Sequence, residues 1–389
     1  MTPQLPIPDT EAQAHSDALR QYIRHKIRQQ GGCIAFKQFM ELALYAPGLG
    51  YYSAGSHKLG AAGDFITAPE LSPLFGATLA QAVMPVLQTL PQSNILEIGA
   101  GSGALAVSIL QSLQQQGHKL EHYYILEVSA DLRERQRQHL QQAGVLECVV
   151  WLETLPENFV GVVLGNEVLD AMPVHLIEIT AKGLEERFVG MEQDEFIWQL
   201  RPASDARLMQ RLGEIERQLS ITLPAGFVSE INLAAEDWLA ALSAACKQAY
   251  VLLIDYGFPR HEYYHPQRQQ GTLMCHYRHH SHDDPFRFIG LQDITAHIDF
   301  TAIADAALAS GWAVAGYTTQ AHFLLGSGLM TWLQGDASAP TVEQLRQQQQ
   351  VKKLTLPHEM GELFKVIGLQ KNLDVDLPGF VLRDLRDRL

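Results

Sequence analysis

The sequence predicts an α/β fold with a Rossmann-like, doubly wound sheet. Short apolar runs alternate with amphipathic helical patterns from about residue 93 to residue 173. The apolar runs are continuous, which is typical of parallel strands covered on both faces. A glycine-rich turn, residues 99–103, stands where the first run gives way to a helical pattern.

An N-terminal helical and loop segment, residues 1–76, precedes this core. Residues 13–46 predict helix because apolar side chains such as Leu19 and Ile23 share one face. Residues 47–76 hold so many glycines and prolines that we expect a loop.

The core itself is expected over residues 77–173. Its predicted strands are residues 95–98, 123–128, 148–152 and 159–164. Helices are expected after the first two strands. The first carries Leu105, Ile109 and Leu113 at helical spacing, and the second covers residues 130–142.

A β/helical insertion, residues 174–248, is expected after the fourth strand. Residues 174–200 indicate antiparallel strands and residues 205–245 indicate helix. Its position suggests a part in substrate recognition. The remainder of the core, residues 249–389, is expected to contain a fifth strand at 250–254, a helix near 301–310 and strands near 312–319 and 363–369.

Composition excludes several classes of protein. The 29 basic and 43 acidic residues give a net charge of −14, which argues against non-specific binding of nucleic acid. The four cysteines form no CxxC pair, so neither a zinc knuckle nor a disulfide framework is expected. Because the sequence has no long apolar run and no signal-peptide pattern, we expect no membrane insertion and a cytoplasmic location. The sequence has no heptad repeat and gives no indication of the oligomeric state.

The glycine-rich turn is the first candidate cofactor site. Glycines permit a tight turn against a ligand, and the helix that follows offers free N–H groups. The candidate residues are Glu97, Gly99, Ala100, Gly101 and Gly103. The glycines alone also satisfy a relaxed dinucleotide fingerprint, and a tight turn without a ligand is the plain alternative.

Glu97 distinguishes between the possible cofactors. Its carboxylate would repel the pyrophosphate of NAD, whereas it would attract the cationic methionine moiety of S-adenosylmethionine (SAM). Glu127 ends the next predicted strand, 24 residues after Gly103, near the ~20-residue spacing at which an acid accepts ribose hydroxyls. It could instead be a neighbour of a helix N-cap, a position for which Ser129 is better suited.

Polar residues directly follow the fourth predicted strand. Asn166, Glu167 and Asp170 would stand at the carboxyl edge of the sheet, where ligands bind in doubly wound folds. We therefore expect these three to be catalytic residues on the methyl-acceptor side. The alternative is a short helix that is stabilised by the acidic side chains at its N-terminus.

Histidines gather between residues 261 and 282 without a metal-ligand spacing such as H-E-x-x-H. We interpret this segment as a flexible polar loop and expect no metal.

The motifs together resemble one known family. They are FMELALYAPGLGYYS (39–53), GDFITAPELSPLFG (63–76), LEIGAGSG (96–103), NEVLDAMPV (166–174), LLIDYG (252–257) and DITAHIDFT (293–301). This set, spread from about residue 20 to residue 370, resembles the MidA family of SAM-dependent methyltransferases. The resemblance implies a class I SAM-dependent methyltransferase fold with SAM as cofactor. The family's mitochondrial member further implies methylation of a protein arginine, with a respiratory complex I subunit as a possible partner.

The resemblance adds residues to the cofactor site. It implies that Thr67, Pro69 and Glu70 belong to a loop that closes over SAM, and that Asp255 and Tyr256 lie nearby. Cys33 stands where the family pattern suggests proline. An assembly chaperone with a methyltransferase fold, a small-molecule methyltransferase and an NAD-dependent oxidoreductase are the alternatives.

Overall fold

The computed structural model describes residues 5–54, 67–333 and 341–389. The chain forms two compact units, each assembled from three stretches of sequence. The first, here the Rossmann unit, comprises Ile66–Val168, Trp238–Gly257 and Phe300–Leu389. The other, here the second unit, comprises Met1–Phe65, Leu169–Asp237 and Phe258–Asp299. The segments expected from the sequence follow one another, whereas these units interleave along the chain.

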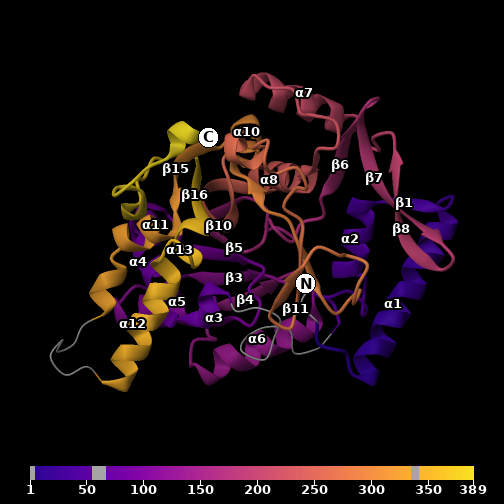
Figure 1. Cartoon of the computed structure of the whole chain (residues 1–389). Coiled ribbons are helices and arrows are strands. Elements are labelled where there is room, and N and C mark those ends of the chain that lie inside the picture. Colours follow the sequence, from indigo (N-terminus) through magenta and orange to yellow (C-terminus); the bar gives the residue numbers. More distant parts are fainter. Residues whose placement is uncertain (1–4, 55–66, 334–340) are drawn as a thin grey trace. The chain divides into compact units, whose positions relative to one another are not determined.

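The Rossmann unit is built on a largely parallel sheet with the strand order β15-β16-β10-β5-β2-β3-β4 (Figure 1). Its strands are β2 (Asn94–Ile98), β3 (His122–Leu126), β4 (Val149–Leu152), β5 (Phe159–Asn166), β10 (Cys246–Phe258), β15 (Ala313–Thr319) and β16 (Phe364–Lys371). Strands β4, β3, β2, β5 and β10 are parallel, and β16 runs antiparallel to both β10 and β15. The predicted doubly wound α/β sheet is confirmed.

The order of the strands reverses at β2. The chain continues from β2 to β3 and β4 on one side, and then returns to place β5 and β10 on the other side. Ligands of doubly wound sheets bind outside the carboxyl ends of the strands at such a reversal. The candidate turn, residues 99–103, follows β2 directly.

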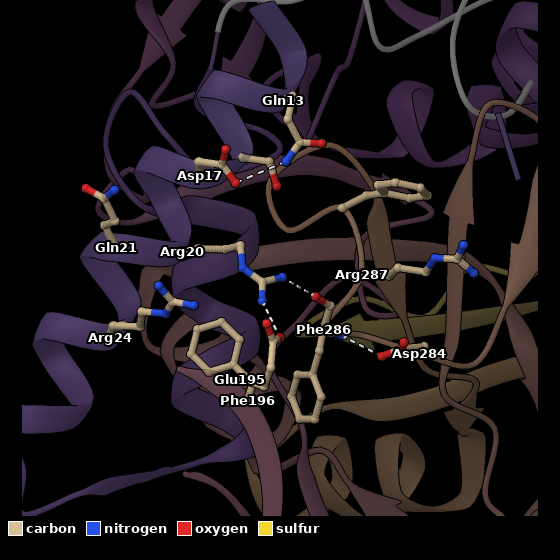
Figure 2. A pocket seen from close by; sticks show the side chains of 12 residues that line it. Gln13, Asp17, Arg20, Gln21, Arg24, Glu195, Phe196, Asp284, Phe286 and Arg287 are labelled. Atoms are coloured by element: carbon tan, nitrogen blue, oxygen red, sulfur yellow. Dashed lines mark hydrogen bonds and ion pairs between the residues drawn. The ribbon is translucent and has the colours of Figure 1, made fainter. Parts of the chain in front are cut away.

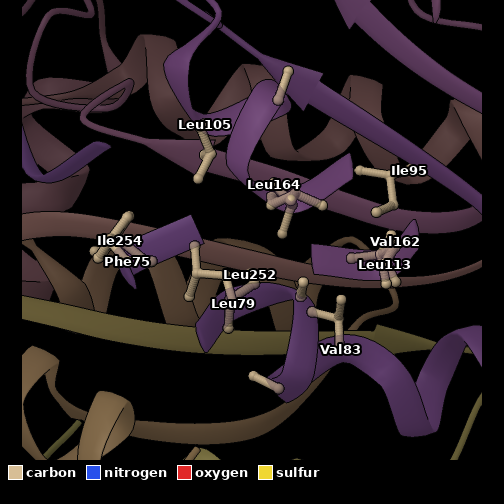
Figure 3. Packing of buried hydrophobic residues seen from close by; sticks show 14 of the residues in the cluster. Phe75, Leu79, Val83, Ile95, Leu105, Leu113, Val162, Leu164, Leu252 and Ile254 are labelled. Atoms are coloured by element: carbon tan, nitrogen blue, oxygen red, sulfur yellow. The ribbon is translucent and has the colours of Figure 1, made fainter. Parts of the chain in front are cut away.

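Helices α4 (Pro73–Thr89), α5 (Ala104–Gln115) and α6 (Ala130–Gln142) belong to the Rossmann unit. Figure 3 shows side chains of α4, such as Leu79 and Val83, in one buried cluster with Leu105 of α5 and Leu164 of β5. The remaining helices of this unit are α3 (Ala68–Leu71), α10 (Phe300–Ala309), α11 (Gln320–Gly326), α12 (Val342–Thr355) and α13 (Met360–Leu363), with the 3₁₀ turns η1 (Leu329–Trp332), η2 (Pro378–Phe380) and η3 (Arg386–Arg388). Helix α8 (Leu233–Ala245) carries the chain from the second unit into the Rossmann unit.

The loop expected over residues 47–76 is wrong in its last third. Helices α3 and α4 begin there, and each has a proline in its first turn, where the missing N–H costs no hydrogen bond. The Ser72 hydroxyl caps α4 by accepting from the Leu74 N–H at 3.3 Å. Residues 63–66, the start of the GDFITAPELSPLFG motif, lie outside the described residues.

The second unit contains an antiparallel sheet with the order β1-β7-β6-β9, and β8 pairs with β7. These strands are β1 (Cys33–Ala35), β6 (His175–Thr180), β7 (Gly183–Glu192), β8 (Glu195–Arg201) and β9 (Val228–Ile231). A smaller sheet joins β12 (His280–His282), β11 (Met274–Tyr277) and β13 (Asp293–Thr295). The helices wholly within the second unit are α1 (Thr10–Gln29), α2 (Phe36–Tyr45), α7 (Arg207–Leu219) and α9 (Arg260–Tyr263), and the short strand β14 is Ile298–Asp299.

Two predicted helical stretches are interrupted by strands. Strand β1 divides residues 13–46, and β9 divides residues 205–245. Both strands are short, and they form because they pair with β7 and β6 respectively. The second half of the histidine-rich segment forms the β11–β12 pair, whereas residues 265–273 contain no helix or strand, as predicted for a loop. Among the described helices, none combines the length and apolarity needed to cross a membrane.

Candidate cofactor site

The register of the sheet brings the predicted residues of the Rossmann unit to one edge. Ile98 is the partner of Leu126 on β3 and of Gly165 on β5, while Asn166 is the partner of Ile254 on β10. The residues that follow these positions therefore leave the sheet side by side. This row contains the glycine turn, Glu127, Glu167 and Asp255.

The glycine turn has a backbone that favours glycine. Gly99, Gly101 and Gly103 have φ angles of +66°, +54° and +84°. A Cβ on Gly99 would also lie 3.4 Å from Cγ2 of Val168. Helix α5 begins directly after Gly103, so its unpaired N–H groups are available to a ligand.

Glu97 lies at the end of β2 and is buried, with 3% of its surface exposed. The Tyr123 hydroxyl on β3 donates to its carboxylate at 2.7 Å. Burial raises the pKa of Glu97 to about 7, although the Tyr123 hydrogen bond lowers it. The charge of this carboxyl can therefore change near neutral pH.

The Glu127 side chain is held in place because each of its two carboxylate oxygens accepts a hydrogen bond. Oε1 accepts from the Ser129 N–H at 2.9 Å, and Oε2 accepts from Nε2 of Gln136 at 3.3 Å. Burial raises the pKa of Glu127, and these hydrogen bonds oppose the shift. A carboxylate fixed in this way retains acceptor capacity for the hydroxyls of a ribose.

Helix α3 lies beside the glycine turn. The Ser102 hydroxyl donates to the carboxylate of Glu70. Thr67 occupies the N-cap position of α3 and Pro69 its first turn, so these three residues belong to a helix start instead of the predicted loop. The resemblance to the family is the only indication in the sequence of their place near the turn.

Asn166 and Glu167 stand at the carboxyl end of β5. Glu167 has a φ of +53°, and its N–H donates to the Ile254 carbonyl at 2.9 Å. Nδ2 of Asn166 donates to Oε1 of Glu167 at 3.1 Å. Oδ1 of Asn166 is buried and, within the described part of the chain, has no hydrogen-bond partner. This oxygen can therefore accept from a donor on a ligand.

Asp255 positions the turn that carries Glu167. It is 1% exposed, and its Oδ2 accepts from the Val168 N–H at 3.2 Å. Sequence reasoning placed Asp255 near the site but gave it no role. It also missed Tyr123, Ser102 and Gln136, for which only the position of their elements near the turn offered a signal.

Asp170 belongs to the second unit, because the division between the units falls after Val168. Its carbonyl accepts from the Ala296 N–H at 3.0 Å, and the carbonyl of Ala171 accepts from the Tyr45 hydroxyl at 2.9 Å. Three of the motifs that carry the family resemblance thus meet here. Asn166 and Glu167 are hydrogen-bonded to each other in the Rossmann unit, whereas Asp170 belongs to the second unit.

Tyrosines and carboxylates surround this part of the second unit. The rings of Tyr45 and Tyr52 are stacked with their centroids 5.5 Å apart. The Tyr52 hydroxyl donates to Asp293 at 2.9 Å, and Asp293 and Asp170 are 2% and 5% exposed. Burial raises the pKa of Tyr52, and the nearby Asp293 charge adds to this effect. Negative charge is therefore concentrated beside an aromatic stack.

The residues of the Rossmann unit fit SAM. The three glycines at positive φ leave the turn without a Cβ at positions 99, 101 and 103. Glu97 can carry a charge opposite to that of the ammonium group of the methionine moiety, and Asn166 offers a buried acceptor. Across residues 5–54, 67–333 and 341–389, no three His, Cys, Asp or Glu side chains are grouped to hold a metal ion.

A pocket of about 690 Å³ lies in the second unit (Figure 2). Arg20 of α1 spans it, donating to the Phe286 carbonyl at 3.1 Å and to Glu195 at 2.8 Å. Its lining includes none of the residues of the predicted site. The predicted cofactor residues therefore lie at the sheet edge and not in this pocket.

Several known proteins resemble this chain over most of its length. Residues 78–318, well over half of the chain, match the family described as "Putative S-adenosyl-L-methionine-dependent methyltransferase". The mitochondrial protein arginine methyltransferase NDUFAF7 of Danio rerio is 28% identical, covering 87% of this chain and 83% of that protein. The human protein of the same name is 27% identical, covering 90% and 82%.

One solved structure is more similar. It is a "likely methyl transferase" from Burkholderia thailandensis bound to S-adenosyl-homocysteine, 44% identical, with a TM-score of 0.93 over 99% of this chain and 100% of that chain. The resemblance predicted from the motifs is thereby confirmed, and the chain belongs to the family of S-adenosyl-L-methionine-dependent methyltransferases.

Proposed function

We propose that this protein transfers the methyl group of SAM to an arginine side chain of a protein substrate. The observation that carries the proposal is the group of Tyr45, Tyr52, Asp170 and Asp293 in the second unit. A guanidinium is protonated at any working pH and binds both to aromatic faces and to carboxylates. The names of the curated relatives support the same acceptor.

In the Rossmann unit, we assign the acceptor side of the cofactor to Asn166 and Glu167. SAM, when bound, supplies an electrophilic methyl group on a sulfonium. Glu167 lies at the edge of the sheet where the cofactor residues gather, so its carboxylate can orient a cationic acceptor and take up the proton that the nitrogen loses. The strained backbone of Glu167 is held by Ile254 and, through Val168, by Asp255.

The test is methyl transfer from tritiated SAM into a lysate of cells that lack this protein. We expect a labelled protein band, and acid hydrolysis of the band should release labelled methylarginine. Glu167→Gln should bind S-adenosyl-homocysteine within about twofold of wild type and lose transfer by about 10²-fold or more. The control is Glu157→Gln, an exposed carboxylate of the same unit.

Two results would refute the proposal. Label on a small molecule or on another amino acid would exclude arginine as the acceptor. Transfer by Glu167→Gln at the wild-type rate would remove the catalytic role of Glu167. Asp170→Asn and Tyr45→Phe test the second unit separately, and we expect Asp170→Asn to raise the KM for the protein substrate without changing SAM affinity.

The family resemblance makes a respiratory complex I subunit the first protein to test as the partner. Purified subunit would replace the lysate in the same assay. The cytoplasmic location expected from the sequence remains a prediction.

A further inference from the structure

Gln136 of α6 is fully buried, although α6 is a mostly polar helix. Its side chain contacts both parts of the cofactor site. Nε2 donates to the Gly101 carbonyl at 3.0 Å and to Oε2 of Glu127 at 3.3 Å. Its backbone and aliphatic carbons lie 3.6–3.7 Å from the position of a Cβ on Gly103. One side chain therefore links the glycine turn to the carboxylate assigned to the ribose.

Trp151 determines which way this amide faces. The indole Nε1 of Trp151 donates to Oε1 of Gln136 at 2.8 Å. An indole N–H can only donate, so the amide oxygen must face Trp151. Both amide hydrogens then point to Gly101 and Glu127. A carboxylate or an apolar side chain at position 136 could not make these two bonds.

We infer that Gln136 is a positioning residue for the cofactor. It holds the Glu127 carboxylate in the orientation that accepts the ribose hydroxyls, and the Gly101 carbonyl anchors the Gln136 amide in that position. A second contact from α6 supports the turn, because Nδ1 of His139 lies 3.1 Å from the Ser102 carbonyl. The inference rests on the assignment of Glu127 to the ribose and not on the identity of the methyl acceptor.

The test compares two ligands by calorimetry on the full-length protein, with no acceptor present. One ligand is S-adenosyl-homocysteine and the other is its analogue without the 2′ and 3′ hydroxyls. Hydrogen bonds to a charged group contribute enough for wild type to prefer the first ligand by about tenfold or more. In Gln136→Met, which keeps the length of the side chain, we expect S-adenosyl-homocysteine to bind about tenfold more weakly and the analogue to change by less than about twofold.

The preference between the two ligands separates positioning from a merely structural role. Loss of packing at position 136 would weaken both ligands alike and leave the preference unchanged, and that result would overturn the inference. Gln138→Met, an exposed change on the same helix, should behave as wild type. Trp151→Phe keeps Gln136 but removes the donor that orients its amide, so it should also lower the preference for S-adenosyl-homocysteine over the analogue. This variant replaces Gln136→Met in the test if Gln136→Met does not fold.

Wild-type protein that binds S-adenosyl-homocysteine but does not distinguish the ligands would refute the ribose role of Glu127 and the role of Gln136 with it. Wild-type protein that binds neither ligand would overturn the cofactor site as a whole. Failure of the arginine proposal would leave all of these binding results unchanged.

Discussion

Glu97 makes the site sensitive to pH. Because its pKa is raised to about 7, the buried carboxyl is largely neutral at pH 6 and largely ionised at pH 8. The ionised form attracts the α-ammonium group that the methionine moiety of SAM and the homocysteine moiety of S-adenosyl-homocysteine have in common. We therefore expect the affinity for S-adenosyl-homocysteine to rise by up to about tenfold from pH 6 to pH 8, and to be flat over this range in Glu97→Gln. A wild-type affinity that does not change with pH would contradict the role of Glu97.

The same carboxyl affects the stability of the ligand-free protein. A folded pKa above the unfolded value means that the protonated group stabilises the fold fully below about pH 4.5, and that this contribution is lost as the pH rises through about 7. Glu97→Gln has no such group. We expect Glu97→Gln to melt at a higher temperature than wild type at pH 8, even though it binds the cofactor less well. Scanning calorimetry of both proteins at pH 5 and pH 8 measures the melting temperatures that are compared.

Gly101 tests the glycine turn. A valine there would place a branched side chain on a backbone with φ of +54°, in the space that the ligand is expected to occupy. Gly101→Val should abolish detectable binding of S-adenosyl-homocysteine. Gly117→Val is the matched control, because φ is +69° at Gly117 and a Cβ there meets nothing within 4 Å. Binding by Gly101→Val at wild-type affinity would show that the cofactor lies elsewhere.

The sequence allowed some of these residues to be predicted and not others. Glu97, the glycine turn, Glu127 and Asn166 lie at the ends of mostly apolar strands or directly after them, so their place at the sheet edge follows from the order of elements. Gln136 is one of several glutamines in a polar helix, and although it shares a helix face with Leu132 and Leu140, nothing in the sequence shows which groups its amide contacts. Its burial arises only when α6 packs beside the turn and Trp151.

At the level of elements, the contact between α4 and α5 depends on one glycine. A Cβ on Gly76 would lie 2.1 Å from Oγ of Ser108. We expect Gly76→Ala to lower the free energy of unfolding by roughly 1–3 kcal/mol, measured by urea denaturation. In a Ser108→Gly background the nearest remaining atom is Cδ1 of Leu105 at 3.3 Å, the end of a flexible side chain. The same change should then become close to neutral, since alanine is the better helix former. A loss of equal size in both backgrounds would contradict this packing.

The elements that were predicted correctly share one property. Strands β2, β3, β5 and β10 are mostly apolar, and the long buried stretches of β2, β5 and β10 reflect a sheet that is covered on both faces. Strands β1 and β9 are too short to show a period, and they depend on their partners. The starts of α3 and α4 were hidden because proline marks both a loop and the first turn of a helix.

At the level of the whole molecule, the Rossmann sheet depends on a strand far along the chain. Strand β16 lies between β10 and β15 and pairs with both. We expect a chain that ends at residue 360 to expose two strand edges, to aggregate in size-exclusion chromatography and to show no rise in melting temperature with S-adenosyl-homocysteine. Adding residues 361–389 as a separate chain during expression should restore part of the soluble protein. A monodisperse truncated protein that responds to the ligand would refute this dependence.

The position of β16 in the sheet also affects how the chain folds while it is being synthesised. The ribosome makes β10 and β15 before β16, yet β16 must enter between them. While the intervening residues are still being added, both neighbours present unpaired backbone groups to other nascent chains. The interval is longest on a slowly translated message, so codon choice between residues 320 and 364 should influence how much of the newly made protein reaches the native state.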